Sequence, residues 1–538
     1  MVFYRCKIWG FIMNIKNSIN KKNIVILLLL ILICGIIFFF QTQKSGFHED
    51  EIYSQVSAVN PYNGLMSAYE NDDVFANQPP VWKSREYVKD YVTLTTDNYL
   101  NMVSIYKNQA IDNHPPVFYV LAHFSSILFG GNFTKYSIFL VNIIAFLLSC
   151  IVIKKIFKTM NKENLTIPTI ILYGLSMGTI SMVLYQRMYM VLTLFILLYF
   201  YYSIKIYINE FNIDKKLIIK LGLVTVFGFL TQYFFVFYAA VIFLIIAIAM
   251  IKNKKYKNLA KYVIMHVIYA AIGIILFPPC IYHLLMTDRG IKNLENTNYL
   301  TNLVKYIEHI AYSFSIKEIM LVLFPLLLIV FIGITYLKKK TNERFFIYLA
   351  TIPTTIFLLL TVQLTSFQEL RYIMPIIPFV VIIFYLMLDI LIDVKYKNYI
   401  FIGISVILVL NGLIFATPKF LYKNYNESIK IAENNKEKSF VYVYDNFFNH
   451  MQSIPEMMIY EKTLIINTNK NELEYLSKDE ELNNENEYIL CIKNYMNNEE
   501  ILNYIKNNTD FKNIEKLYTN ESFASDEYVL NNLYLVSK

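Results

Sequence analysis

The chain has 538 residues, of which 56% are hydrophobic and only 17% are charged. Soluble proteins carry about 25% charged residues, so this composition excludes an ordinary soluble protein and predicts several membrane spans. The formal net charge of +8 comes from short runs of Lys and Arg between apolar segments. That pattern orients a membrane protein and does not indicate a nucleic-acid partner.

A bilayer-crossing helix needs roughly 17 to 25 mostly apolar residues. The first apolar run follows a long basic segment, 1–23, and no small-residue cleavage site comes after it, so we interpret it as a retained span and not as a signal peptide. We predict about eleven spans, at 24–40, 135–153, 167–184, 188–206, 217–231, 232–251, 262–282, 318–337, 344–362, 372–393 and 399–416.

One further apolar stretch, 117–129, decides the topology, and it is too short to cross. If it is an interfacial or re-entrant helix in the first outer loop, 41–134, the basic loops all fall on the cytoplasmic side. This gives a cytoplasmic 1–23 segment, a transmembrane domain at 24–417 and an extracytoplasmic tail at 418–538. Localisation in the cell membrane follows, with the N-terminus in the cytoplasm.

The tail has a soluble composition and alternates predicted strands and helices. "SFVYVYD", "TLIINT" and "EYILCIKN" are predicted strands separated by helical segments, and "IEKLYT" and "EYVLNNLYLV" are two more. This order predicts a small α/β domain with a largely parallel sheet. It has no Gly-rich phosphate loop and no cluster of catalytic residues, so it favours binding or structural support over chemistry.

Asp50 and Glu51 lie shortly after the first span, in "GFHEDEIYSQ". Adjacent acids near a membrane are either solvated surface or functional, and a carboxylate held near a hydroxyl acts as a general base. A divalent metal site is the other functional interpretation, but adjacent acids alone do not favour it. The five cysteines form no CxxC pair, so no zinc site is indicated. His48 and Glu49 are expected at the rim.

The segment "DNHPP" precedes the predicted interfacial helix. Pro115 and Pro116 suit the first turn of a helix and place Asp112 and His114 at its N-terminal end, where an anion can bind. The alternative is a membrane-skimming helix without a ligand.

Arg187 and Arg371 lie where apolar spans meet the outer surface, beside Tyr189 and Tyr372. Arginines there either extend among interfacial aromatics or bind phosphate through their planar fork. Glu369 is an alternative partner for Arg371.

Five segments together resemble the glycosyltransferase C superfamily, in particular the branch with protein O-mannosyltransferases and lipid A aminoarabinose transferases. The resemblance covers about residues 24–400 and rests on "FHEDEIYSQVSA", "DNHPPVFYVLAHFSSILFG", "QRMYMVLTLF", "LTQYFFVF" and "ELRYIMPIIPF", in that order. Gln232 departs from the pattern, because it stands where relatives often have His.

The resemblance implies a transferase that takes a sugar from a polyprenyl phosphate and passes it, with inversion, to a hydroxyl of a cell-envelope acceptor, which is a protein, lipid or glycopolymer. Asp50 would be the base and Glu51 its neighbour, and no cofactor is needed. The implied substrate-binding residues are Asp112, His114, Arg187, Arg371, Tyr189 and Tyr372. The alternatives are a multi-span transporter or lipid flippase, whose sites tend to lie at the membrane midplane, and a non-catalytic scaffold.

Overall fold

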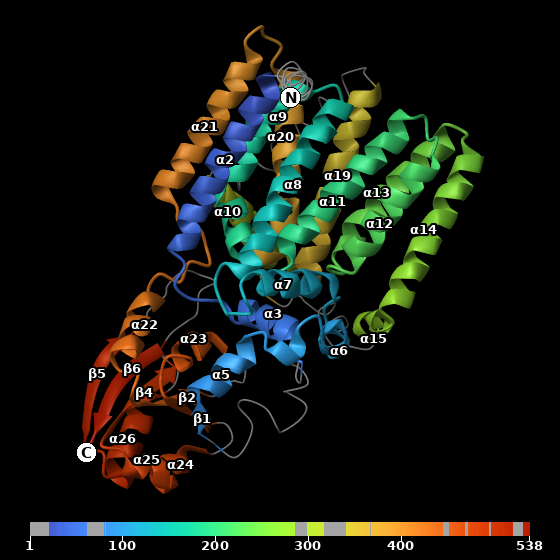
Figure 1. The fold of residues 1–538 in the computed structure, drawn as a ribbon. Helices are drawn as coiled ribbons and strands as arrows, with labels where there is room; N and C mark the ends of the chain where they lie inside the picture. The colour runs from blue at the N-terminus through green and yellow to red at the C-terminus, as the bar shows by residue number, and fades with distance from the viewer. Residues whose placement is uncertain are drawn as a thin grey trace, which may run out of the picture.

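The computed structural model describes residues 21–61, 80, 82–285, 298–316, 341–365, 367–444, 451–468, 472–493, 497–519 and 531–538. Its two main parts are a bundle of long helices and a smaller domain built on a sheet, with short helices between them (Figure 1). The first described helix and the C-terminus lie at opposite ends of the molecule (Figure 1).

The bundle is built from eleven described helices. Eight are long and apolar enough to cross a membrane, and a bent pair, broken by 59° at Ser176, makes a ninth candidate span. The helices are α2 Lys21–Thr42, α8 Ser137–Thr159, α9 Thr166–Leu175, α10 Met177–Leu184, α11 Tyr189–Ile208, α12 Lys215–Phe229, α13 Phe235–Lys252, α14 Tyr256–Leu276, α19 Thr341–Leu364, α20 Ile377–Leu391 and α21 Lys397–Phe415.

Nine of the eleven predicted spans correspond to these candidates. The predicted span at 217–231 is α12, which at 15 residues is shorter than a typical crossing helix. The predicted span at 318–337 lies outside the described residues. Two further helices, α15 Pro279–Leu285 and α17 Tyr299–Ser313, join the bundle, and α17 packs against α10.

The described part of the first loop forms four α-helices at one end of the bundle: α3 Glu49–Val59, α5 Arg85–Val92, α6 Met102–Ile111 and α7 Val117–Leu128. The apolar segment predicted to be interfacial is α7, which has 12 residues and lies across the ends of the long helices (Figure 1). It packs on α3 and α8. The prediction of a short helix that does not run through the bundle is therefore confirmed.

The sheet has six strands in the order β1-β3-β2-β4-β6-β5. The prediction of a largely parallel sheet is wrong, because β2 pairs in parallel with β3 and β4 while the other three pairs are antiparallel. Strand β1 comes from the first loop, so the tail alone does not complete the sheet. The strands are β1 Lys83–Ser84, β2 Ser439–Tyr444, β3 Lys462–Asn467, β4 Glu487–Lys493, β5 Asn513–Thr519 and β6 Asn531–Ser537.

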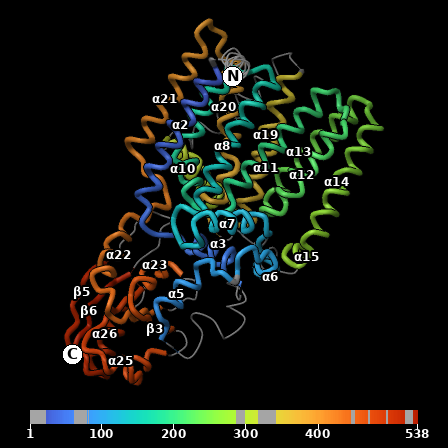
Figure 2. Tube along the Cα trace, in the orientation of Figure 1, coloured from blue at the N-terminus to red at the C-terminus, as the bar shows by residue number. Residues whose placement is uncertain are grey.

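Short helices surround the sheet, and the chain reaches them directly from α21 (Figure 2). They are α22 Tyr425–Asn434, α23 Ile454–Met457, α24 Tyr475–Lys478, α25 Glu480–Asn484 and α26 Asn498–Asn508.

The sheet domain supports the helix that carries the acidic motif. Ile52 and Val56 of α3 and Val88 of α5 share one buried apolar cluster with Phe440 and Tyr442 of β2. Gly46 permits the close approach, because a Cβ there would lie 2.9 Å from Cβ of Tyr422. Burial of these side chains stabilises the contact by roughly 1.5 to 3 kcal/mol for each large residue. The position of α3 therefore depends on both parts of the molecule.

Candidate active site

The N-terminus of α3 is fixed by a reciprocal cap. Nδ1 of His48 accepts a hydrogen bond from the backbone N–H of Asp50 at 3.0 Å, and the carboxylate of Glu51 accepts one from the backbone N–H of His48 at 2.7 Å. Such a capping box satisfies two amides that a helix start leaves unpaired. Burial lowers the pKa of His48 to about 3, although Asp50 opposes the shift, so the ring is neutral at pH 7 and can accept. His48 is thus a buried cap and not a rim residue.

Glu51 is fully buried in an ion pair with Lys44. Nζ of Lys44 lies 3.0 Å from both carboxylate oxygens, and both side chains have 0% exposure. The backbone N–H of Gln186 also donates to Glu51, at 2.8 Å. Because the carboxylate is already saturated with donors and closed to solvent, its geometry suits a residue that positions α3 against the start of α11.

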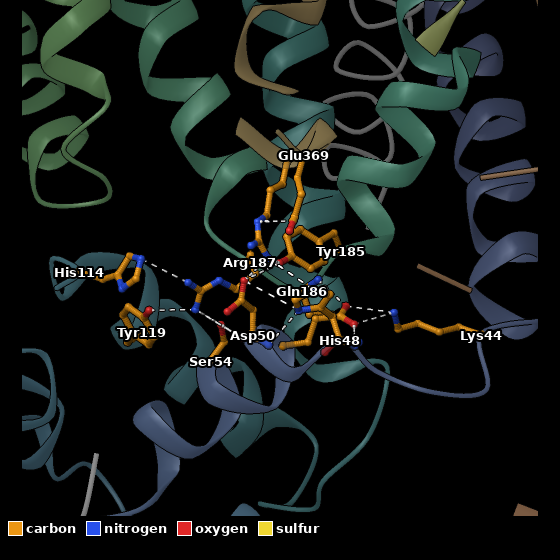
Figure 3. A network of polar contacts seen from close by, with 12 residues as sticks. Lys44, His48, Asp50, Ser54, His114, Tyr119, Tyr185, Gln186, Arg187 and Glu369 are labelled. Atoms are coloured by element: carbon orange, nitrogen blue, oxygen red, sulfur yellow. Dashed lines mark hydrogen bonds and ion pairs between the residues drawn. The ribbon is translucent and has the colours of Figure 1, made fainter. Parts of the chain in front are cut away.

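Asp50 has a different environment from its neighbour. Its side chain is 22% exposed, and its carboxylate accepts hydrogen bonds from Arg371 Nη1 and, at 2.9 Å, from the hydroxyl of Tyr185. Figure 3 shows Asp50 and Tyr185 meeting at the end of the bundle. Burial opposes ionisation, but Arg371 and Arg187 outweigh it and hold the pKa of the Asp50 carboxyl below its ordinary value of 3.8. Asp50 is therefore ionised, and its side chain is accessible to solvent.

Arg187 lies in the short break between α10 and α11. Its Nη1 donates to Ser54 Oγ at 3.0 Å, to Tyr119 OH at 3.2 Å and to the backbone carbonyl of Asp50 at 3.3 Å. Its Nε is buried and has no hydrogen-bond partner among the described residues. Since a buried unpaired donor is costly, this guanidinium is suited to an anionic ligand.

Asp112 and His114 join the same network from the other side. Asp112 is the C-cap of α6, and its carboxylate lies 3.0 Å from Nδ1 of His114. Nε2 of His114 in turn lies 3.3 Å from Nη2 of Arg187 (Figure 3). Burial opposes ionisation of Asp112, but His114 outweighs it and lowers the pKa. The first amide of α7, that of Val117, donates to the carbonyl of Leu230, so this one amide is not available to an anion.

The predicted tyrosines form the apolar wall of the site. Tyr372 lies in the single turn η4, Leu370–Tyr372, and its ring centroid is 5.2 Å from the Arg371 guanidinium. Tyr189 stacks on Tyr185, with ring centroids 6.0 Å apart, and meets Tyr372 edge-on. The predicted partner Glu369 does pair with Arg371, with a distance of 2.8 Å from Nε. Arg371 therefore bridges two carboxylates.

All eight residues singled out in the sequence gather at one end of the bundle. The sequence interpretation did not assign roles to Tyr185, Ser54, Tyr119 and Lys44, which complete the network (Figure 3). Tyr185 had a detectable signal, because it stands two residues before Arg187 in the same short break. Within the part of the chain that the structure describes, no group of three His, Cys, Asp or Glu side chains is arranged to hold a metal ion.

The arrangement combines an ionised carboxylate with two arginines at one end of the helix bundle. A carboxylate in this position can take a proton from a hydroxyl. The guanidinium groups can bind a phosphate and stabilise negative charge that develops on it. The geometry thus fits displacement of a phosphate leaving group by a hydroxyl oxygen.

One family model matches part of the chain. Residues 113–283 match the family model described as dolichyl-phosphate-mannose-protein mannosyltransferase. The matched segment contains His114 and Arg187 but not Asp50 or Arg371. Comparison with curated protein sequences gives no match.

Solved structures give the fold. ArnT from Cupriavidus metallidurans bound to undecaprenyl phosphate is similar with a TM-score of 0.54 and 10% identity, over 96% of this chain and 98% of that one. The apo state of the same protein gives 0.49 and 8% over the same shares. The family match and this fold confirm the predicted resemblance to the glycosyltransferase C superfamily and indicate a multi-span membrane glycosyltransferase.

Proposed function

We propose that the protein transfers a sugar from a polyprenyl-phosphate donor to a hydroxyl of a cell-envelope acceptor on the extracytoplasmic face. The observation that carries the proposal is the contact between the Asp50 carboxylate and Arg371, with Arg187 beside it. A base and two phosphate-binding groups in one place are what such a displacement needs. The fold neighbour bound to undecaprenyl phosphate supports the class of donor.

In the proposed reaction, Asp50 removes the proton of the acceptor hydroxyl as its oxygen attacks the anomeric carbon. The bond from that carbon to the phosphate oxygen breaks, and the lipid phosphate leaves from the opposite face with the electron pair. A single displacement of this kind inverts the anomeric configuration. Arg371 and Arg187 stabilise the departing phosphate, and positioning contributes the rest of the rate enhancement.

Arrival of the donor also activates the base. Without ligand, Arg371 neutralises Asp50 and keeps its proton affinity low. A lipid phosphate that binds Arg371 competes with Asp50 for the same guanidinium, so the carboxylate becomes a stronger base when the donor is in place. Glu369 remains as a second partner of Arg371 and limits how far the side chain moves. The proton affinity of the Asp50 carboxylate therefore depends on whether the donor is bound.

Two assignments follow for the acids. Asp50 is the proposed catalytic base, since it is the accessible member of the pair, whereas Glu51 is a positioning residue held by Lys44. The proposed reaction needs no metal, because the arginines supply the positive charge.

A direct test incubates the purified full-length protein with polyprenyl-phosphate-linked sugars and cell-envelope acceptors. Mass spectrometry should detect a glycosylated acceptor and a matching amount of free polyprenyl phosphate. The proposal is wrong if a panel of hexosyl and pentosyl donors gives no protein-dependent release, while envelope glycans are unchanged in a strain lacking the chain.

A further inference from the structure

A cavity that Asp50 does not line lies at the junction of the bundle and the sheet domain. This cleft has a volume of about 660 Å³ and is lined by three separate parts of the chain. They are the turn after α2, the connection between α7 and α8, and the region of α22 and α23. The buried pair of Lys44 and Glu51 lies between the cleft and the site around Asp50, since Lys44 lines the cleft while Glu51 lies in the first turn of α3, next to Asp50.

The charge of this cleft is positive. Lys44, Lys135 and Lys423 line it, and none of the described lining residues is Asp or Glu. Lys44 is neutralised by Glu51, but Lys135 donates to the backbone carbonyls of Thr42 and Lys44, at 2.8 and 2.6 Å, which leaves its charge uncompensated. The side chain of Lys423 is exposed. Two lysines therefore line one cavity with no carboxylate partner among the described residues.

The cleft also has an apolar wall, and it lies at the end of a candidate membrane span. Phe47 and Phe133, with ring centroids 4.9 Å apart, line it together with Ile429 and Ile459. Thr42, another lining residue, ends the candidate span Lys22–Thr42. The cleft thus lies at the height where a bilayer crossed by α2 would have its lipid head groups. Positive charge beside apolar surface at this depth matches an amphiphilic anion.

We propose that this cleft binds a phosphate-bearing molecule at a second site, separate from the site of sugar transfer. Lys135 and Lys423 contact the phosphate, and the two phenylalanines pack against the part of the ligand that carries it. The same chemistry is offered by the head group of an anionic membrane lipid and by a soluble glycerol phosphate unit. The proposal goes beyond the transfer reaction and stands independently of it.

The test measures binding of phosphatidylglycerol, with phosphatidylcholine as the neutral reference, to the full-length protein by native mass spectrometry. A lysine near a membrane surface contributes about 1 kcal/mol toward an anionic lipid, which corresponds to about fivefold in affinity. Lys423→Gln should weaken phosphatidylglycerol binding by about that factor, and adding Lys135→Gln should weaken it further. Because Lys423 is exposed, its single variant remains informative if the double variant does not fold.

Lys430→Gln is the matched control. Lys430 lies on α22 in a surface pair with Glu427 and does not line the cleft, so this variant should bind as the wild type does. Equal affinity of the wild type and Lys423→Gln for phosphatidylglycerol, or an equal loss in Lys430→Gln, would overturn the proposal.

A parallel titration with glycerol phosphate identifies the source of the phosphate. Binding that depends on Lys423 for both probes supports a site for the phosphate itself, and dependence for the lipid alone supports a lipid head group. Undecaprenyl phosphate, measured on the same samples, separates this site from the proposed donor site. Arg371→Gln should weaken its binding and leave that of phosphatidylglycerol unchanged, whether or not sugar transfer is detected.

Discussion

Arg371 donates from Nη1 to the carboxylate of Asp50, although the two residues are 321 positions apart in the chain. The contact joins the first loop to the turn before α20 and places a potential base against a potential phosphate ligand. Neither Asp50 nor Arg371 is needed to fix α3 in place, because the buried pair of Glu51 and Lys44 already does so. The proposed mechanism depends on this relationship.

Replacing Arg371 with Lys keeps the charge but removes the planar fork. We expect kcat/KM for sugar transfer to fall roughly 100-fold, the loss seen when one donor to a developing oxyanion is removed. Undecaprenyl phosphate should also bind more weakly. Arg344→Lys, which alters an arginine of α19 near its N-terminal end, is the matched control and should retain activity. Unchanged kinetics in Arg371→Lys would contradict a role for the planar guanidinium fork at the leaving phosphate.

Tyr185→Phe removes one hydroxyl from the site with little change in shape. The hydroxyl donates to Asp50 and accepts from Arg371, each at 2.9 Å. Hydrogen bonds to charged groups contribute about 1.5 to 3 kcal/mol, so transfer should slow by about tenfold or more. Steady-state kinetics measure the effect. Tyr173→Phe, whose hydroxyl lies 3.9 Å from the Met190 sulfur, should be nearly silent, and an equal loss in both variants would point to packing instead.

Glu49 should make stability depend on pH. Burial, aided by Asp50, raises the pKa of this carboxyl from 4.5 to about 7, with Arg371 and Lys493 opposing the shift. The folded protein therefore binds more protons than the unfolded chain between these values, and stability falls as pH rises through them. Glu49→Gln should reduce the drop in unfolding temperature between about pH 5 and about pH 8, an interval that includes the folded-state pKa of about 7.

The surface variant Glu427→Gln is the control for this measurement, because its side chain is 54% exposed. It should keep the wild-type pH dependence. An identical profile for Glu49→Gln and the wild type would show that Glu49 is not held in a protonation state different from that of the unfolded chain.

Removal of divalent metal ions should not impair the reaction. The proposed mechanism stabilises the leaving phosphate with Arg371 and Arg187, so transfer by protein treated with a chelator should match that of untreated protein. Loss of activity on chelation, with recovery on adding back one divalent cation, would favour a metal bound by the acids of the first loop.

The sequence predicted which residues share one end of the molecule better than it predicted their partners. Charge bias and the short length of 117–129 placed Asp50, Arg187 and Arg371 on one face, and the structure brings them into contact. The pairing of Lys44 with Glu51 was not predictable in this way, since both are polar residues of one loop and only the fold shows that they are buried. The extracytoplasmic orientation stays a prediction.

The sheet shows a different limit of prediction from the sequence. Strands β2, β3 and β4 were predicted near their observed positions, because continuous apolar runs between polar turns mark buried strands. The direction of strand pairing was predicted wrongly for two physical reasons. β5 and β6 follow one another without a predicted helix between them, which permits antiparallel pairing, and β1 reaches the sheet edge from more than 350 positions away.

Asp50→Asn is the measurement that tests the central claim most directly. The substitution keeps the size of the side chain and removes its capacity to take a proton, so sugar transfer should fall by at least about 100-fold. Binding of undecaprenyl phosphate should persist or become tighter, because Arg371 loses its carboxylate competitor. Full transfer activity in the folded Asp50→Asn protein would contradict the assignment of Asp50 as the base and with it the proposed mechanism.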